Sequence, residues 1–108
     1  MTTSLSLDSA YDDGKRVLIA AGEIDLSNID TFRRALADAA DDSARNGTTL
    51  TVDLSAVEYL DSAAINALFD RSERIDALIA HPLLMSSLTV SGLTELVTTE
   101  AAASASEP

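Results

Sequence analysis

The spacing of apolar residues changes repeatedly along this chain, from the period of a strand to the period of a helix. Between residues 50 and 54, apolar and polar side chains alternate, which is typical of a strand. Between residues 28 and 45, apolar side chains recur at helical spacing and line one face. Strands that alternate with helices favour an α/β fold, in which a largely parallel sheet packs against helices.

The same reasoning divides the rest of the chain. Asp12-Asp13-Gly14 is a turn sequence between two short strands, so the chain begins with an antiparallel hairpin. Ser27 is a favourable N-cap for the first helix, with Asp30 three residues later, and Asn46-Gly47 is a natural helix end. The predicted strands are 5–11, 17–21, 50–54 and 75–80, and the predicted helices are 28–45, 62–74 and 83–90, with a short crossing at 55–60 and a final turn at 93–96. We therefore expect a mixed, mostly parallel four-stranded sheet with flanking helices.

The core must be aliphatic, because aromatic residues make up only 4% of the chain. A chain of 108 residues suffices for one compact domain, which we place at residues 1–97. Residues 98–108 are rich in Ala, Ser, Thr and Glu without periodicity, so we expect a disordered C-terminal tail there. The residues expected in the core are Leu18, Ile19, Leu50, Val52, Leu54, Ile65, Leu68 and Phe69.

The charge of the chain limits its partners. A net charge of −11 repels nucleic acids and anionic membrane surfaces, so we expect neither as a partner. The absence of cysteine excludes disulfides and thiolate-bound metals. The N-terminal residues do not have the pattern of a signal peptide, and no apolar stretch is long enough to cross a membrane. We therefore expect a cytoplasmic protein.

The most informative local sequence is Asp61-Ser62, which follows a strand and opens a helix. The Ser62 hydroxyl would lie where unpaired backbone N–H groups point outward and the helix dipole is positive. Such a position can hold a phosphate ester. The plainer interpretation is that Asp61 or Ser62 only caps the helix, since Asp and Ser are common caps. The residues alone leave both interpretations open.

Three motifs in the same order resemble those of STAS domains, and in particular of bacterial anti-sigma factor antagonists. The main one is Asp53-Leu54-Ser55-Ala56-Val57 followed by Leu60-Asp61-Ser62. Gly22-Glu23-Ile24-Asp25-Leu26 is similar to an earlier motif of the family, and Ser91-Gly92-Leu93 to a later one. The resemblance covers about residues 5–97 and implies a STAS fold.

The resemblance also implies site residues. It places phosphorylation at Ser62 and partner binding at Asp25, Asp61, Ser62, Ala63 and Ala64. Asp25 would lie near the phosphoserine, although it equally suits the turn at a strand end or an additional helix cap. The family usually has a small hydroxyl residue and then Gly where this chain has Ala63 and Ala64, so we expect Ala64 to crowd an approaching partner.

The function implied is binding of an anti-sigma factor, often a serine kinase in this family, with release of the sigma factor. A separate phosphatase would remove the phosphate from Ser62. ATP would belong to the kinase, so no cofactor is expected in this chain. One alternative is a structural STAS subunit of a larger assembly, with Ser62 as a plain cap.

A second alternative is an enzyme, which a deep pocket holding Asp25 and Asp61 would favour. No catalytic motif is present, and a Ser–His–Asp triad could use only the single histidine, His81, which we expect to be solvated in a turn. The acidic residues late in the first helix are interpreted as a solvated face, and no metal site is expected. Neither catalytic nor metal-binding residues are therefore assigned.

Overall fold

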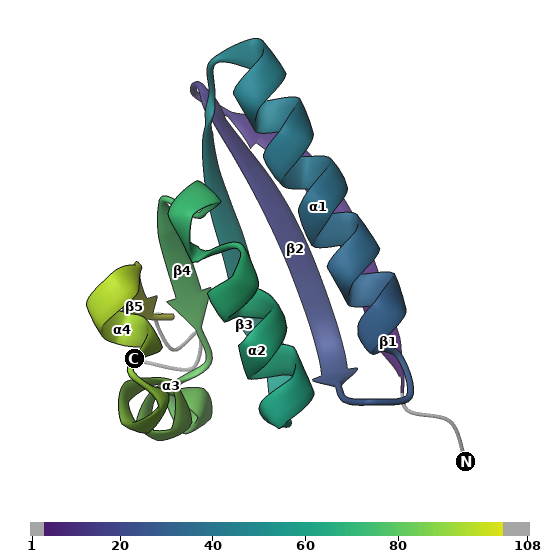
Figure 1. Ribbon diagram of the computed structural model, residues 1–108, viewed down its shortest axis with the longest axis vertical. Helices are drawn as coiled ribbons and strands as arrows, with labels where there is room; N and C mark the ends of the chain where they lie inside the picture. The colour runs from purple at the N-terminus through teal and green to yellow at the C-terminus, as the bar shows by residue number, and fades with distance from the viewer. Residues whose placement is uncertain (1–3, 103–108) are drawn as a thin grey trace, which may run out of the picture.

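The computed structural model describes residues 4–102 as an α/β domain with one five-stranded sheet (Figure 1). The strands are β1 (Leu5–Asp12), β2 (Lys15–Ile24), β3 (Thr49–Leu60), β4 (Ala77–Ala80) and β5 (Thr98–Ala101). The helices are α1 (Ile29–Asn46), α2 (Ser62–Asp70), η1 (Ser72–Arg74), η2 (Pro82–Leu84), α3 (Met85–Ser91) and α4 (Leu93–Leu96), with η marking a 3-10 turn. The predicted α/β class is confirmed.

The strands lie in the sheet in the order in which they occur in the chain. β1 pairs with β2 antiparallel, and β2, β3, β4 and β5 then pair in parallel. The first hairpin turns at Asp13 and Gly14, whose φ angles are 51° and 81°. Two successive residues with positive φ match the right-handed twist of the flanking strands, and Asp and Gly tolerate that conformation well. The predicted hairpin is thus explained by its turn sequence.

The sheet has five strands where the sequence predicted four. Thr98–Ala101 forms β5 and pairs with β4, and the Ala102 N–H donates to the Ala80 carbonyl at 2.7 Å. The expectation of disorder from residue 98 onward is therefore wrong for residues 98–101. This edge strand is held mainly by backbone hydrogen bonds, and its side chains bury little surface. Its sequence therefore lacks an alternation of apolar residues. The remainder of the predicted tail, 103–108, lies outside the described residues.

β3 is longer than expected, because it includes the segment 55–60 that the sequence suggested as a crossing. Its pairing with β2 is shifted twice, between Ile19 and Ala21 and between Gly22 and Glu23. Each shift interrupts the two-residue period, so Val57 and Leu60 are both buried although they are three residues apart. Because the alternation of apolar residues is interrupted, the sequence did not reveal residues 55–60 as part of β3.

Several helices begin or end at other residues than the sequence predicted. α1 begins after Asn28, and the Ser27 hydroxyl, which was expected to cap this helix, bonds to Asp25. α1 ends as expected at Gly47, which adopts the left-handed conformation. α2 ends at Asp70, and η1 occupies the last predicted turn. The predicted third helix is divided into η2 and α3, and Gly92 closes α3 as expected.

One aliphatic core lies between the sheet and the helices. α1 and α2 lie side by side against the same face of the sheet (Figure 1). Five of the predicted core residues are buried: Leu18, Leu50, Val52, Leu54 and Leu68. Ile19, Ile65 and Phe69 are only partly buried, and Ile19 belongs to the opposite face of the sheet from its neighbour Leu18. Across residues 4–102, no helix has the length and apolar character needed to cross a membrane.

Candidate functional site

Asp61 joins three segments at the point where β3 ends and α2 begins. Its Oδ1 accepts a hydrogen bond from the Ala64 N–H at 3.1 Å, which makes Asp61 the N-cap of α2. Its Oδ2 accepts from the Leu26 N–H at 3.0 Å, and its own N–H donates to the Ile24 carbonyl at 3.2 Å. Both carboxylate oxygens are thus engaged, and the loop after β2 is fixed to the start of α2. Of the two caps considered from the sequence, the structure selects Asp61.

The loop between β2 and α1 is closed by its own side chains. Asp25 Oδ1 accepts from the Ser27 N–H at 2.9 Å and from the Ser27 hydroxyl at 2.5 Å. The Asn28 side chain accepts from the Asp25 N–H and donates to the Glu23 carbonyl, both at 3.0 Å. Asp25 therefore takes part in turn chemistry at the strand end, as one of the two interpretations proposed. Asn28 was not identified from the sequence. It occupies the N-cap position of α1, but its side chain closes this loop and does not cap the helix.

Gly22 is required by the close approach of the N-terminal strand. Its φ is +105°, and a Cβ atom placed there would lie 2.3 Å from the Ser4 carbonyl oxygen. That same carbonyl accepts a hydrogen bond from the Glu23 N–H at 2.9 Å. The glycine of the Gly22-Glu23-Ile24-Asp25 motif thus lets the chain before β1 bond to the end of β2. The motif fixes the loop that reaches Asp61.

Ser62 is exposed at the first position of α2. Within residues 4–102 its hydroxyl makes no hydrogen bond, so its oxygen is accessible from solvent. The N–H groups of Ser62 and Ala63 precede the first intrahelical bond, which runs from Ile65 to the Asp61 carbonyl at 3.1 Å. The N-cap therefore leaves two first-turn donors next to an exposed hydroxyl.

Two large apolar side chains on the segments that Asp61 joins are exposed and were not identified from the sequence. Leu26 is 76% exposed, and Tyr59 is 50% exposed. Leu26 is held beside α2 by its hydrogen bond to Asp61, and Tyr59 lies opposite Glu23 in the β2–β3 pairing. We call Leu26 and Ser62 the loop-helix surface. The sequence signal was present, since Leu26 is an apolar residue in a turn.

The two alanines after Ser62 differ in their exposure to solvent. Ala63 is partly buried, whereas Ala64 is fully buried in the core, with 0% exposure. The expectation that Ala64 contacts or crowds a partner is therefore corrected, because its methyl group points into the protein. Its N–H is taken by the Asp61 carboxylate. Of the predicted partner-binding residues, Asp25, Asp61, Ser62 and Ala63 keep solvent exposure.

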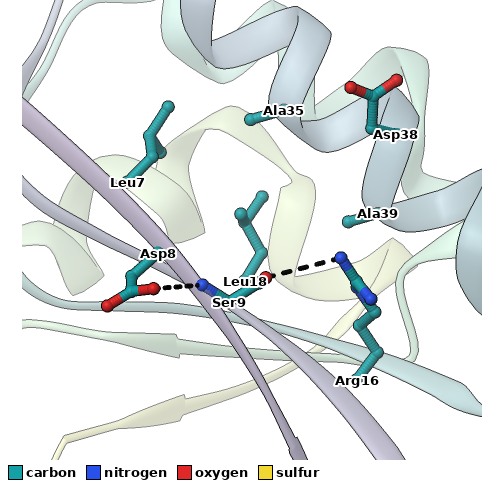
Figure 2. Close-up of a pocket in the computed structure, with 8 residues that line it drawn as sticks. All are labelled: Leu7, Asp8, Ser9, Arg16, Leu18, Ala35, Asp38 and Ala39. Atoms are coloured by element: carbon teal, nitrogen blue, oxygen red, sulfur yellow. Dashed lines mark hydrogen bonds between the residues drawn. The ribbon is translucent and has the colours of Figure 1, made fainter.

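The cavity shown in Figure 2 lies away from these residues, between β1, β2 and α1. Its volume is about 290 Å³, and neither Asp25 nor Asp61 lines it. At its rim, Arg16 donates to the Ser9 hydroxyl at 3.4 Å, and the Ser9 N–H donates to Asp8 at 2.9 Å. This cavity therefore gives no support to an enzyme site at Asp25 and Asp61.

Beyond the cavity, Arg16 joins Tyr11 and Asp42 in a polar cluster. The Tyr11 hydroxyl and the Arg16 guanidinium both donate to Asp42 Oδ2. The hydrogen bond from Tyr11, followed by the charges of Arg16 and Arg45, lowers the pKa of the Asp42 carboxyl below its usual value. This cluster ties β1 and β2 to α1.

The other polar residues considered from the sequence make contacts within the fold. His81 is partly buried, and its Nδ1 accepts from the Leu83 N–H at 3.0 Å, so it caps η2 and is not simply solvated. Asp42 belongs to the polar cluster and Asp41 pairs with Arg74 at 3.9 Å, so these helix acids are engaged by arginines. In residues 4–102, no group of three or more His, Cys, Asp or Glu side chains could hold a metal ion.

Comparison with known proteins agrees with this architecture. Residues 8–98 match the family model described as Mlab, STAS domain. RsfB of Mycobacterium tuberculosis strain H37Rv, named an anti-sigma-F factor antagonist, is 38% identical over 72 residues. The match covers 67% of this chain and 57% of RsfB, so it spans little more than half of that relative.

Solved structures confirm the predicted STAS fold. An anti-sigma factor antagonist from Mycobacterium paratuberculosis superposes with a TM-score of 0.79 at 25% identity, over 89% of this chain and 85% of that one. Unphosphorylated SpoIIAA, also named an anti-sigma factor antagonist, gives a TM-score of 0.66 at 15% identity, over 93% and 89% of the two chains. At that identity the SpoIIAA likeness concerns the fold alone.

Proposed function

Because this chain belongs to the STAS domain family, we propose that it is an anti-sigma factor antagonist that is switched by phosphorylation of Ser62. It binds an anti-sigma factor in the cytoplasm, and the sigma factor is released. The names of RsfB and of the Mycobacterium paratuberculosis protein support the type of partner. The chain acts by binding and contributes no catalytic group.

The observation that carries this proposal is the position of Ser62. Its hydroxyl is exposed and makes no hydrogen bond in the described chain, while Asp61 beside it holds the loop that bears Leu26. A kinase can therefore reach the oxygen without unfolding α2. A partner can also contact the Ser62 hydroxyl and the Leu26 side chain together, because Asp61 fixes the Leu26 loop relative to the start of α2.

The switch is a phosphoryl transfer. The anti-sigma factor, acting as a serine kinase, transfers the γ-phosphoryl group of ATP to the Ser62 oxygen, the hydroxyl proton is lost, and ADP leaves. A phosphatase then hydrolyses the ester with water and restores the hydroxyl. Both reactions are carried out by partner proteins, so ATP and catalytic metal ions belong to them.

The phosphate can be tolerated by the fold and still oppose binding. The free N–H groups of Ser62 and Ala63 and the helix dipole favour a negative group at this position. A phosphoserine adds about −1.5 to −2 charges at neutral pH. Asp61 is adjacent and Asp25 belongs to the loop that Asp61 holds, so the phosphate joins a surface that is already acidic. A partner that fits the neutral hydroxyl would have to desolvate this charge without compensation.

The test is a titration of the anti-sigma factor that co-purifies with the chain. Calorimetry compares the wild type with Ser62→Ala and Ser62→Asp. We expect Ser62→Ala to bind like the wild type and Ser62→Asp to bind about a hundredfold more weakly, which corresponds to about 2.8 kcal/mol. Ser87→Asp adds the same charge at an exposed position on α3 and serves as the control.

Equal affinities of all three proteins would contradict the switch. Combined with the absence of phosphoserine in protein purified from cells, that result would favour the structural STAS subunit, with Ser62 as the first residue of a helix. Turnover of ATP by the isolated chain, abolished by Asp61→Asn or Asp25→Asn, would contradict the binding role and favour an enzyme.

A further inference from the structure

The two faces of the sheet are covered very differently. Against α1 and α2, the sheet residues are buried, as Leu18 and Leu78 are with 3% and 1% exposure. On the opposite face, their neighbours Ile19 and Ile79 remain partly exposed to solvent. Sheets made mainly of parallel strands are usually covered on both faces. Within residues 4–102 this sheet has a helical layer on only one of them, so its other face is a candidate for contact with a partner.

The pairing register places acidic and aliphatic residues alternately across this open face. Asp8 is opposite Ile19, Ile19 opposite Asp53, Asp53 opposite Ile79, and Ile79 opposite Glu100. We call this set, with one residue from each strand, the acidic row. Neighbouring strands are about 4.8 Å apart, so carboxylates on alternate strands recur at about 10 Å with an isoleucine between them.

The neighbouring row has only small side chains and is mostly apolar. It consists of one residue from each strand in the same order: Ala10, Val17, Thr51, Ala77 and Thr98. No side chain in it is larger than valine, so an element that contacts the acidic row can lie close to the sheet. Thr51 at its centre is already 92% hidden by its neighbours, with 8% exposure.

The charges on this face define the chemistry of the occupant. Within the described chain, none of Asp8, Asp53 and Glu100 forms an ion pair with Lys or Arg. The alternation of side chains along the strands places Asp12 and Lys15 on the same face, which is therefore acidic overall. A second copy of the chain would bring like charges together, so self-association through this face is disfavoured. A positively charged partner is favoured.

We propose that this face of the sheet docks a basic amphipathic helix of a partner protein. A helix rises about 1.5 Å per residue, so Lys or Arg residues seven positions apart recur at about 10.5 Å. This spacing matches the carboxylates of the acidic row. Aliphatic residues midway between the cations then contact Ile19 and Ile79. The helix lies across the strands, and about 15 residues suffice to reach from Asp8 to Glu100.

This docking does not depend on the proposed role of Ser62. The loop-helix surface lies at the start of α2, and α2 covers the opposite face of the sheet (Figure 1). Both surfaces can therefore be occupied at once. The basic helix can belong to a further domain of the anti-sigma factor or to another protein, and its recognition rests on the same charge and spacing in either case.

The test uses two synthetic helical peptides of equal composition with the full chain. In one, Lys residues recur every seven positions with Leu midway between them; in the other, the same residues are placed in a different order. We expect only the first to bind measurably by fluorescence anisotropy. Amide chemical-shift changes should be confined to the open face, around Val17, Ile19, Ala77 and Ile79.

Substitutions test whether the peptide binds to the acidic row. The double variant Asp8→Asn with Glu100→Gln should weaken binding about tenfold or more, and Ile79→Thr should do the same. Asp30→Asn removes one exposed charge on α1 and should leave affinity unchanged. Asp8 and Glu100 are exposed, so the charge variant retains the fold even if Ile79→Thr does not.

Three results would overturn the proposal. They are equal binding of both peptides, shift changes centred on Leu26 and Ser62, or a stable dimer in sedimentation that is broken by Ile79→Thr. The first would indicate general attraction of cations to an acidic chain. The second would place the basic partner on the loop-helix surface, and the third would show that a second copy covers the sheet.

Discussion

The carboxylate of Asp61 accepts a hydrogen bond from the backbone N–H of Leu26 at 3.0 Å, although the two residues are 35 positions apart. The other oxygen of that carboxylate caps α2 at Ala64. One side chain thus performs two tasks: it starts the helix that bears Ser62, and it positions the most exposed apolar residue near that serine. The stability of α2 and the position of Leu26 are therefore coupled at Asp61.

Replacement of Asp61 should separate these two tasks. Asp61→Ala should lower the free energy of unfolding by about 0.5–2 kcal/mol, as loss of an N-cap does, and should weaken binding of the anti-sigma factor through the released Leu26 loop. Asp61→Asn keeps an oxygen acceptor for the cap and should be milder in urea denaturation. Equal losses of stability for Ala and Asn would show that the cap bond at Ala64 contributes little.

Leu26→Ser should reduce affinity for the anti-sigma factor without changing the fold. Exposed apolar residues that become buried in an interface often contribute more than about 1.4 kcal/mol, which is tenfold in affinity. Calorimetric titration measures the effect. Leu96→Ser, at another largely exposed leucine on α4, is the matched control. If both variants bind like the wild type, Leu26 does not belong to the interface.

Gly22→Ala should destabilise the domain by more than about 1 kcal/mol, because the new Cβ would meet the Ser4 carbonyl and φ is strained. Gly47→Ala is the informative control. Its φ of +66° is also left-handed, but nothing lies within 4 Å of the added atom. The difference in unfolding free energy between the two variants reports the clash together with the greater strain of Ala at a φ of +105°. Equal values would mean that the chain around Ser4 moves away at little cost.

Leu68→Ala should cost about 2–5 kcal/mol in the free energy of unfolding, since the side chain of Leu68 is fully buried. Leu83→Ala removes the same atoms from a residue that is 73% exposed and should change stability by less than about 0.5 kcal/mol. Thermal or urea unfolding of both proteins provides the comparison. A silent Leu68→Ala would be incompatible with the packing of α2 on the sheet.

The cluster around Asp42 predicts a specific acid sensitivity. The hydrogen bond from Tyr11 lowers the Asp42 pKa in the folded protein below the value of about 3.9 that holds in unfolded chains. The unfolded state then binds more protons, so the stabilisation is present above about pH 4 and is lost as the pH falls through the folded pKa. Asp42→Asn should reduce the dependence of the unfolding free energy on pH in this acidic range. An unchanged acid profile would show that other carboxyls dominate it.

The period of apolar residues sufficed to predict the parallel sheet, the hairpin and the principal helices. It worked where strands and helices bury one face, as in residues 50–54 and in α1. It failed for β5, which is held by backbone bonds at an edge, and for the second half of β3, where shifts of register break the alternation. Neither feature leaves a regular pattern in the side chains.

The candidate site was only partly predictable. Asp61 and Ser62 could be placed at a helix start, because capping depends on local residue types. The bond from Leu26 to Asp61 joins segments far apart in the chain, so no local pattern reveals it. The burial of Ala64 depends on which side of α2 faces the core, and in a helix of nine residues one small side chain carries little information about that.

The sequential order of the strands has a consequence for synthesis on the ribosome. Each strand from β2 to β5 pairs with the strand that was made immediately before it. Among the described strands, only β1 must wait for its first partner, and the hairpin of β1 and β2 can form as soon as both have left the exit tunnel. Each later strand then adds to an edge that already exists. Translation from the first residue to the last is therefore also an order of assembly, in which a nascent chain extends its sheet one strand at a time.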